Sequence, residues 1–315
     1  MGQLRYSVTF NNQIEEYKKS ILVDPDKSLS IRSILFGSIS EGISEIKNLL
    51  RSDDVNSAIN FIRKLGIKFK KVNENKYLVY GQGLGSLFIS KNKILDFGNS
   101  GTLCRLGCGI LSTSPNLNVR LTGDKSLKKR NLSTMIDALE KFGATFYPQK
   151  KNYLPLQLVS SNIPTGIDFV EKKGSAQIVS SVSLAAINSF GKTKIVQEKI
   201  SRNHTQIFLK KIGSDIYFKK SGAKNIIEIN GKKKLNNFKI EIPGDPSSAA
   251  FFTALTLLKK KSLLTIRNMG LNPTRIGFYE LLKKHGAKIK IKNIRKKNNE
   301  LVGDIFVKSS KIKPI

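Results

Sequence analysis

The chain has 315 residues, of which 39% are hydrophobic and 25% are charged, and its formal net charge is +32. This length and composition fit a globular protein of two domains, each with enough residues for a core. The longest apolar run, residues 249–258, is too short to span a bilayer, and the first residues lack the apolar segment of a secretory signal. We therefore expect a soluble cytoplasmic protein without a membrane partner.

The net positive charge is only a weak indication of function. Of the 55 basic residues 11 are arginine, and the lysines are spread along the chain. Lysine, asparagine and isoleucine are all abundant, which an AT-rich genome produces without selection for function. No RNA-binding motif or zinc-finger spacing accompanies the lysines. We expect no specific nucleic-acid partner, and a basic surface that steers small anionic substrates.

The two cysteines, Cys104 and Cys108, lie four residues apart with no histidine or acidic residue beside them. This spacing favours two small buried residues over a metal site. Two cysteines also exclude a disulfide framework. We expect neither a metal ion nor a cofactor.

The first predicted structural unit starts at the polar loop Lys27-Ser28, which is followed by a helix over residues 28–40. A second helix is predicted over residues 55–65. Its apolar residues recur at i, i+3, i+4, i+7 and i+10, after a capping region at residues 52–54. A glycine follows this helix, and residues 76–80 then have the β-branched and aromatic bias of a strand.

The same order of elements recurs three more times along the chain. The glycines that end the second helices are 70 to 77 residues apart. Such a period predicts one α/β unit repeated four times, in the order loop, helix, strand, helix, glycine, strands. Asn272-Pro273 is expected to open the last helix, with an asparagine cap and proline at the first helical position. The glycines are Gly66, Gly143, Gly213 and Gly286; the further helices after polar loops cover residues 102–111, 176–188 and 247–258; the further strands cover residues 117–121, 194–197 and 263–266.

The first predicted helix of each unit follows a loop rich in glycine, serine or lysine. The first turn of a helix offers free N–H groups and a partial positive charge, which suit a phosphate or carboxylate. For a single loop, tight turns and solvated basic side chains are the better interpretation, because short Gly/Ser motifs are weak signals. Four loops in register reverse that preference, since loops gathered at one end of packed repeats would form one anion site. They are residues 27–28, 98–102, 174–175 and 244–248.

Six segments resemble, in order, motifs of the 5-enolpyruvylshikimate-3-phosphate synthases, a family of enolpyruvyl transferases. The resemblance runs from about residue 5 to residue 315. Details such as Ser-Ala-Gln, Arg-Asn-His and Asn-Pro-Thr-Arg resemble the bacterial class II branch of the family. The segments are residues 26–32, 95–106, 121–130, 174–177 with 201–205, 242–250 and 271–275.

The resemblance implies a fold of two domains, each made of three βαβαββ-type units whose helices pack inside, an inside-out α/β barrel. Carried over, residues 24–241 form a complete three-unit domain. Residues 1–23 and 242–315 form part of a second domain, with one of its three units, so four of six units are present. The helix at residues 247–258 is apolar on nearly all sides, which implies burial all round in a complete domain. With the partner units absent, we expect this helix to be exposed and prone to association. The full-length protein is expected to be a monomer.

The resemblance also implies an activity. The enolpyruvyl group of phosphoenolpyruvate is transferred to the 5-hydroxyl of shikimate 3-phosphate, with release of phosphate, in chorismate and aromatic amino-acid biosynthesis. Glyphosate would occupy the phosphoenolpyruvate site. The residues that would hold shikimate 3-phosphate are Lys27, Ser28, Arg32, Ser175, Ala176, Gln177 and Arg202, and those that would hold phosphoenolpyruvate are Lys27, Asn99, Gly101, Arg130 and Gln177.

The catalytic acid and base are not assigned to residues of this chain. By the resemblance, a catalytic aspartate and a Lys–Glu pair follow beyond residue 315, so we expect a C-terminally truncated chain that is inactive alone. Lys27 would be shared by both substrates, and the role of Arg105 stays open. Asp124 and Asp245 are interpreted as turn and cap residues.

Two other functions are weighed against this one. The related transferase that acts on UDP-N-acetylglucosamine has Lys-Asn where this chain has Lys27-Ser28, and it lacks the Gly-Asn-x-Gly-Thr loop, so it ranks far behind. A non-catalytic basic binding protein is the third possibility. It would retain nucleic acid in a salt-sensitive way and would show no saturable binding of shikimate 3-phosphate.

Overall fold

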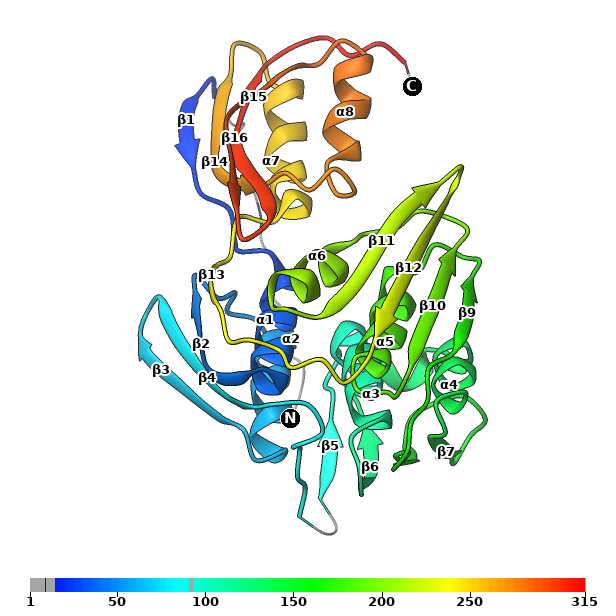
Figure 1. Cartoon of the computed structure of the whole chain (residues 1–315). Coiled ribbons are helices and arrows are strands. Elements are labelled where there is room, and N and C mark those ends of the chain that lie inside the picture. Colours follow the sequence, from blue (N-terminus) through cyan, green and yellow to red (C-terminus); the bar gives the residue numbers. More distant parts are fainter. Residues whose placement is uncertain (1–8, 10–14, 91–92, 315) are drawn as a thin grey trace.

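The computed structural model of the chain describes residues 9, 15–90 and 93–314, which form two bodies (Figure 1). We call residues 24–241 the larger unit, and residues 15–23 with 242–314 the smaller unit. Each unit has its own cluster of buried hydrophobic side chains. The two cores support the predicted domain division, whose boundaries stay a prediction. Residues 1–8 and 10–14 of the predicted second domain lie outside the described residues.

Four copies of one supersecondary unit make up most of the described chain, which confirms the predicted α/β repeat. Each copy runs helix, strand, helix and then a pair of strands. The first comprises α1 (Lys27–Ile39), β2 (Glu41–Lys47), α2 (Asp53–Lys64), β3 (Lys68–Asn73) and β4 (Lys76–Gln82), and the second α3 (Gly101–Ser112), β6 (Asn118–Thr122), α4 (Ser133–Glu140), β7 (Thr145–Pro148) and β8 (Leu156–Val159). The third comprises α5 (Ala176–Ala186), β10 (Lys192–Gln197), α6 (His204–Lys211), β11 (Asp215–Ser221) and β12 (Lys224–Asn230), and the fourth α7 (Pro246–Leu258), β14 (Leu263–Gly270), α8 (Gly277–Lys284), β15 (Lys288–Lys297) and β16 (Glu300–Lys308).

The glycine after each second helix has the left-handed backbone that its position in the sequence predicts. Gly66, Gly143, Gly213 and Gly286 have φ values between +82° and +93°. A residue in this conformation just past a helix end reverses the chain, and glycine adopts it without a Cβ clash. The repeated glycine therefore sets the turn from the second helix of each copy into the following strand.

Each copy contributes three strands to a four-stranded sheet, and a fourth strand pairs in parallel with the strand between the two helices. In the second and third copies that strand directly precedes the copy, as β5 (Ile94–Asp96) and β9 (Asp168–Glu171). In the first copy it is β13 (Lys239–Glu241), and in the fourth it is β1 (Lys18–Ile21). From β1 onward the chain therefore runs from the smaller unit into the larger one and returns, crossing between the units twice.

The helices α1, α3 and α5 lie inside the larger unit, and its three sheets lie outside them (Figure 1). All residues of α1 from Leu29 to Ile39 are buried, and α3 and α5 are buried almost as fully. Cys104 and Cys108 are buried in α3, as the spacing predicts. No helix of the described residues is long and apolar enough to cross a membrane. Because α1, α3 and α5 are buried along their length, their polar N-terminal ends are the parts that a ligand could reach.

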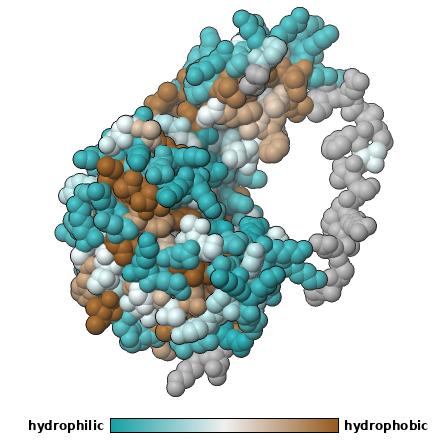
Figure 2. Space-filling model, turned by 90° about the vertical axis from the view of Figure 1, so that its right-hand side faces the viewer, coloured by the Kyte–Doolittle hydropathy of each residue, from teal (hydrophilic) through white to brown (hydrophobic). Residues whose placement is uncertain are grey.

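One side of α7 is exposed, as the sequence predicts for a chain without the partner units. Ala249 and Leu257 are buried, but Phe251 and Leu258 are 80% and 81% exposed. The predicted exposure of this apolar helix is confirmed for one of its sides, because β14 and β16 cover only the other side. Hydrophobic surface is visible on the smaller unit as well as on the larger one (Figure 2).

The start of α8 corrects the sequence prediction. Asn272 does not cap a helix that begins at Pro273. Its side-chain Oδ1 accepts hydrogen bonds from the backbone N and the hydroxyl of Thr274, at 2.9 and 2.7 Å, which makes a local turn. The helix begins only at Gly277. An asparagine followed by proline favours both a cap and a turn, and here the turn is formed.

The β15–β16 hairpin of the smaller unit reaches the larger unit at Lys211. The Nζ of Lys211 donates to the carbonyl oxygen of Lys239 at 3.0 Å and also to the side-chain oxygen of Asn298 in the hairpin turn. Burial lowers the pKa of Lys211 to about 8. The hairpin contact therefore carries a lysine that loses its proton more readily in the folded protein than in the unfolded chain.

This lysine gives a pH-dependent contribution to stability. An unfolded lysine titrates near pH 10.4, so between about pH 8 and that value the unfolded chain binds more protons, and stability rises with pH. We expect the free energy of unfolding of the parent chain, relative to that of Lys211→Gln, to increase across this range in urea titrations. A difference that stays constant from pH 7.5 to 10.5 would contradict the lowered pKa.

Candidate anion-binding site

The first helices of the four copies are α1, α3, α5 and α7. Their N-terminal ends are linked by direct hydrogen bonds. The backbone N of Lys27, at the start of α1, donates to Asp245 before α7 at 3.3 Å. Gln177 in the first turn of α5 donates to the hydroxyl of Thr102 in α3 at 3.0 Å. Arg32 in α1 donates to the hydroxyl of Ser180 in α5 at 3.0 Å. The four predicted polar loops therefore gather into one region, as expected from their register in the repeat.

Short polar side chains cap these helices. Asp26, Ser100, Ser175 and Asp245 each accept a hydrogen bond from a backbone N–H in the first turn of the following helix. Capping satisfies one first-turn N–H group of each helix. Asp245 also accepts from the backbone N of Lys27 in α1, whereas the other first-turn groups of α3 and α5 remain available. Asp245 is thus a cap residue, as predicted. Asp124 accepts from the backbone N of Leu127 at 2.6 Å and is a turn residue, also as predicted.

Arg32 is buried, with 4% of the residue exposed. Its Nε donates to Thr205 at 2.8 Å, its Nη2 to Ser180 at 3.0 Å, and its Nη1 to the carbonyl oxygen of Ser28 at 3.0 Å. Burial lowers the pKa of Arg32 to about 10, so the guanidinium still carries its charge at neutral pH. The interpretation of Arg32 as a solvated loop residue is excluded. Two of its five N–H donors remain beyond these three bonds.

Arg202 lies next to Arg32 and has no hydrogen-bond or ion-pair partner of its own among the described residues. We call these two arginines, together with the starts of α1 and α5, the first cationic group. The side chain of Arg202 is exposed, and among the described residues it forms neither a side-chain hydrogen bond nor an ion pair. Partial desolvation and the nearby Arg275 lower its pKa, while Asp26 and Asp245 raise it. A guanidinium without a partner beside a group of helix N-termini is suited to bind an anion from solvent.

The other predicted residues of this first group lie around the same helix ends. Lys27 is exposed, and its Nζ forms an ion pair with Asp54 at 3.3 Å. Ser28 follows it in the first turn of α1. Ser175, Ala176 and Gln177 form the start of α5 and are all partly exposed.

A second cationic group surrounds the start of α3. The Nη2 of Arg130 donates to the side-chain oxygen of Asn99 at 2.7 Å. The Nη1 of Arg105 donates to the carbonyl oxygen of Gly101 at 3.1 Å, which connects it to the same loop. Asn99 and Arg130 are both exposed. The structure thus brings together the predicted residues Asn99, Gly101 and Arg130, and it adds Arg105, whose role the sequence left open.

Gly101 is packed against both guanidinium groups of this second group. A Cβ atom at Gly101 would lie 2.7 Å from Nη1 of Arg130 and 3.1 Å from Nη1 of Arg105. Both atoms are at the ends of flexible side chains, so a larger residue would displace them and leave the backbone in place. The missing side chain of Gly101 therefore allows the two arginines to converge on this loop.

Three carboxylates near the first group have partners. Asp26 and Asp245 each accept from Arg275 at 2.9 Å, and these three side chains are almost fully buried. Glu300 accepts from Nδ1 of His204 at 2.6 Å and from Asn272 at 2.8 Å. None of these carboxylates is free to act as a general base, which fits their structural role at the contact between the two units.

Sequence reasoning missed several of the groups that hold the site. Ser180 and Thr205 bind Arg32 and are 2.7 Å from each other, yet single hydroxyl residues in helices carry no pattern that marks them. The pairing of Arg275 with Asp26 and Asp245 was also missed, because these residues lie 249 and 30 positions from Arg275 and no local pattern links them. Only their places inside the recognised segments could have drawn attention to them.

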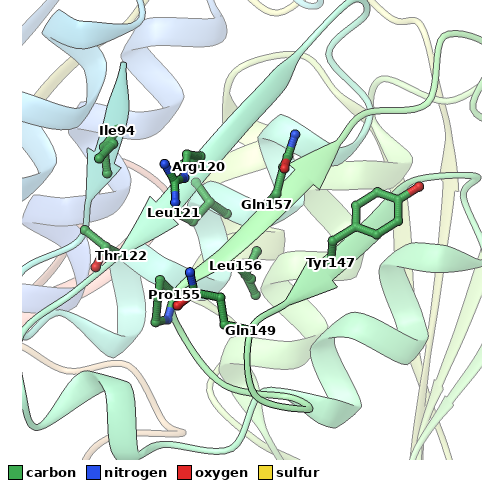
Figure 3. A pocket seen from close by; sticks show the side chains of 9 residues that line it. All are labelled: Ile94, Arg120, Leu121, Thr122, Tyr147, Gln149, Pro155, Leu156 and Gln157. Carbon is green, nitrogen blue, oxygen red and sulfur yellow. The ribbon is translucent and has the colours of Figure 1, made fainter. Parts of the chain in front are cut away.

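A separate shallow pocket of about 290 Å³ lies over the strands β5, β6, β7 and β8. Arg120, Gln157 and Tyr147 line it together with apolar side chains (Figure 3). None of its lining residues belongs to the two cationic groups described above. This pocket is therefore distinct from the candidate site.

Comparison with known proteins gives a consistent result. Residues 12–315 match the family model for EPSP synthase (3-phosphoshikimate 1-carboxyvinyltransferase). The 3-phosphoshikimate 1-carboxyvinyltransferase of Petrotoga mobilis is 37% identical over 303 residues, which cover 96% of this chain and 69% of that protein. The enzyme of the same name from Persephonella marina is 38% identical over 301 residues, which cover 95% of this chain and 68% of that protein.

A solved structure has the same fold. The EPSP synthase of Acinetobacter baumannii superimposes on this chain with a TM-score of 0.86 at 31% sequence identity. The superposition covers 96% of this chain and 67% of that chain. The described chain is therefore similar to about two thirds of that protein.

Proposed function

Because this chain belongs to the EPSP synthase family of enolpyruvyl transferases, we propose that its two cationic groups bind the two substrates of that reaction. The first group, around the starts of α1 and α5, binds shikimate 3-phosphate. The second, around the start of α3, binds phosphoenolpyruvate. The unpaired guanidinium of Arg202 beside four gathered helix ends is the observation that carries this proposal.

The proposed shikimate 3-phosphate contacts follow from charge and position. A phosphate at the start of α5 would meet the free N–H groups of the first turn, the hydroxyl of Ser175 and the amide of Gln177. Arg202 supplies a full positive charge, and the buried charge of Arg32 supports it from behind. Lys27, Ser28 and Ala176 complete the group in this proposal. The cyclohexene ring of the ligand would then lie over the helix ends, with its 5-hydroxyl directed toward α3.

The proposed phosphoenolpyruvate contacts surround the loop before α3. Its carboxylate and phosphate carry the charge that Arg130 and the first-turn N–H groups of α3 can neutralise. Asn99 and Gly101 line the loop, Gln177 reaches it through Thr102, and Lys27 completes the group between the two ligands. These groups stabilise the negative charge of the leaving phosphate as the tetrahedral adduct collapses.

The competing functions are less well supported. The matching family is described as 3-phosphoshikimate 1-carboxyvinyltransferase. The UDP-N-acetylglucosamine transferase is supported only by its shared fold. A non-catalytic basic protein does not account for an arginine buried among hydroxyl groups behind helix N-termini. We also propose that the protein acts in the cytoplasm and as a monomer when full length.

Calorimetric titration of the 315-residue chain with shikimate 3-phosphate tests the proposed function. We expect saturable binding of one molecule per chain, which an excess of UDP-N-acetylglucosamine does not reduce. Retention of nucleic acid with no heat of binding from shikimate 3-phosphate would favour the basic binding protein instead. Shikimate without its phosphate is the control ligand, and we expect it to bind much more weakly.

The Gly101→Ala variant tests the second group separately. The added methyl displaces the guanidinium of Arg130 from Asn99, so we expect the affinity for phosphoenolpyruvate, measured with shikimate 3-phosphate present, to fall about ten-fold. The affinity for shikimate 3-phosphate should change less than about two-fold, which is the internal control. Equal loss of both affinities would show that the two groups are not separate subsites.

A further inference from the structure

Arg275 occupies the point where the two units meet. Its Nη1 donates to Asp26 at 2.9 Å, and its Nη2 donates to Asp245 at 2.9 Å and to the hydroxyl of Ser247 at 3.0 Å. Asp26 caps α1 in the larger unit, whereas Asp245 caps α7 in the smaller unit. One guanidinium therefore holds the caps of two helices that belong to different units.

The backbone supports the same arrangement. The two crossing segments bind each other, with the N of Asp26 donating to Pro243 and the N of Asp245 donating to Asp24, both at 2.8 Å. Nε2 of His204 lies 3.4 Å from Nη1 of Arg275, and Nδ1 of His204 faces Glu300. A neutral imidazole with its proton on Nδ1 satisfies both contacts. Arg275 is the cation paired with both carboxylates, which otherwise accept, among the described residues, only backbone N–H groups at the helix starts.

The charge balance connects this residue to the proposed ligand site. Arg202 lies within electrostatic range of the cations Arg32 and Arg275 and of the anions Asp26 and Asp245. Without Arg275, two buried carboxylates would lack their partner, and Arg202 is the nearby cation without another partner. An arginine that pairs with protein carboxylates is not available to bind a phosphate from solvent. The pairing of Asp26 and Asp245 by Arg275 therefore decides whether Arg202 is free.

We propose that Arg275 is a positioning residue for substrate binding: by pairing with Asp26 and Asp245, it keeps Arg202 available for the phosphate of shikimate 3-phosphate. This inference rests on the proposed function. Arg275 itself does not touch the ligand in this proposal. Its effect passes through Arg202 and through the position of the first turn of α1.

The test is calorimetric titration of shikimate 3-phosphate into Arg275→Gln, with Arg267→Gln as the matched control. Arg267 is an exposed arginine in β14 of the same unit. We expect the affinity to fall about five- to ten-fold in Arg275→Gln and to stay unchanged in Arg267→Gln. The double variant Arg275→Gln with Asp245→Asn removes one unpaired carboxylate and keeps the cap, so it should regain most of the affinity. Arg275→Lys, with one ammonium for two carboxylates, should be intermediate.

Unfolding temperatures, recorded for every variant, separate this role from a purely structural one. If Arg275 only stabilises the fold, Arg275→Gln will unfold at a lower temperature while its folded molecules bind with the parent affinity, and the proposal is overturned. Should Arg275→Gln not fold, the affinities of Arg275→Lys and of the double variant decide. The proposal is overturned if Arg275→Lys binds with the parent affinity, or if the double variant binds no more tightly than Arg275→Lys. Absence of binding by the parent chain overturns the proposed function, and this inference with it.

Discussion

The Gly109→Ala variant is expected to lose about 3 kcal/mol of folding stability or more. Gly109 lies in α3 where that helix crosses α5, and a Cβ there would be 2.3 Å from the carbonyl oxygen of Ser181 and 3.0 Å from its Cα. Backbone atoms cannot rotate away, so the two central helices must separate. Overpacking of a core costs about 1–3 kcal/mol and occasionally more, and a contact with backbone lies at the upper end. Urea unfolding followed by circular dichroism measures the loss.

Gly277→Ala is the matched control for this prediction. Gly277 is also a helical glycine, but a Cβ there would have no atom within 4 Å. Alanine in a helix is favoured over glycine by about 1 kcal/mol, so this variant should be as stable as the parent or slightly more stable. Equal stability of the Gly109→Ala and Gly277→Ala variants would show that α3 and α5 do not pack as closely as described.

The Arg202→Ala variant is expected to bind shikimate 3-phosphate about ten- to a hundred-fold more weakly than the parent chain. A hydrogen bond to a charged group contributes about 1.5–3 kcal/mol, and 1.4 kcal/mol is a factor of ten. Arg202 has no protein partner among the described residues, so its removal should leave the unfolding temperature nearly unchanged. Calorimetric titration measures the affinity, and a thermal scan checks the fold.

Arg120→Ala is the control variant, because it removes one positive charge, as Arg202→Ala does, at a different place. Arg120 is exposed like Arg202 but lines the separate pocket over β5, β6, β7 and β8 (Figure 3). If general positive charge attracts the ligand, both variants will weaken binding equally. Loss of affinity confined to Arg202→Ala would place the phosphate at the first cationic group.

The repeat could be predicted from the sequence because its signals are local. Amphipathic stripes, capping residues and the glycine after each second helix act within a few turns, and the first helix of all four copies has the expected position. The partners of the sheets could not be predicted in this way. β13 joins β2 and β1 joins β14 across most of the chain length, and only the fold brings those strands together.

The candidate site shows the same division between local and distant information. Loops at helix starts, and with them Lys27, Asn99 and Ser175, are visible in the sequence because short polar motifs precede apolar helices. The network of Arg275 with Asp26 and Asp245 depends on contacts between distant segments. Asn272 was misjudged as a helix cap because the turn it forms has the same local sequence preference.

A crystal structure of the chain with bound shikimate 3-phosphate tests the central claim most directly. The account predicts that the phosphate lies at the start of α5, within hydrogen-bond distance of Ser175 and the guanidinium of Arg202. It also predicts that Arg275 remains paired with Asp26 and Asp245. A phosphate bound instead at Arg120, or on the exposed lysines of β15, with Arg202 turned toward Asp26, would contradict it.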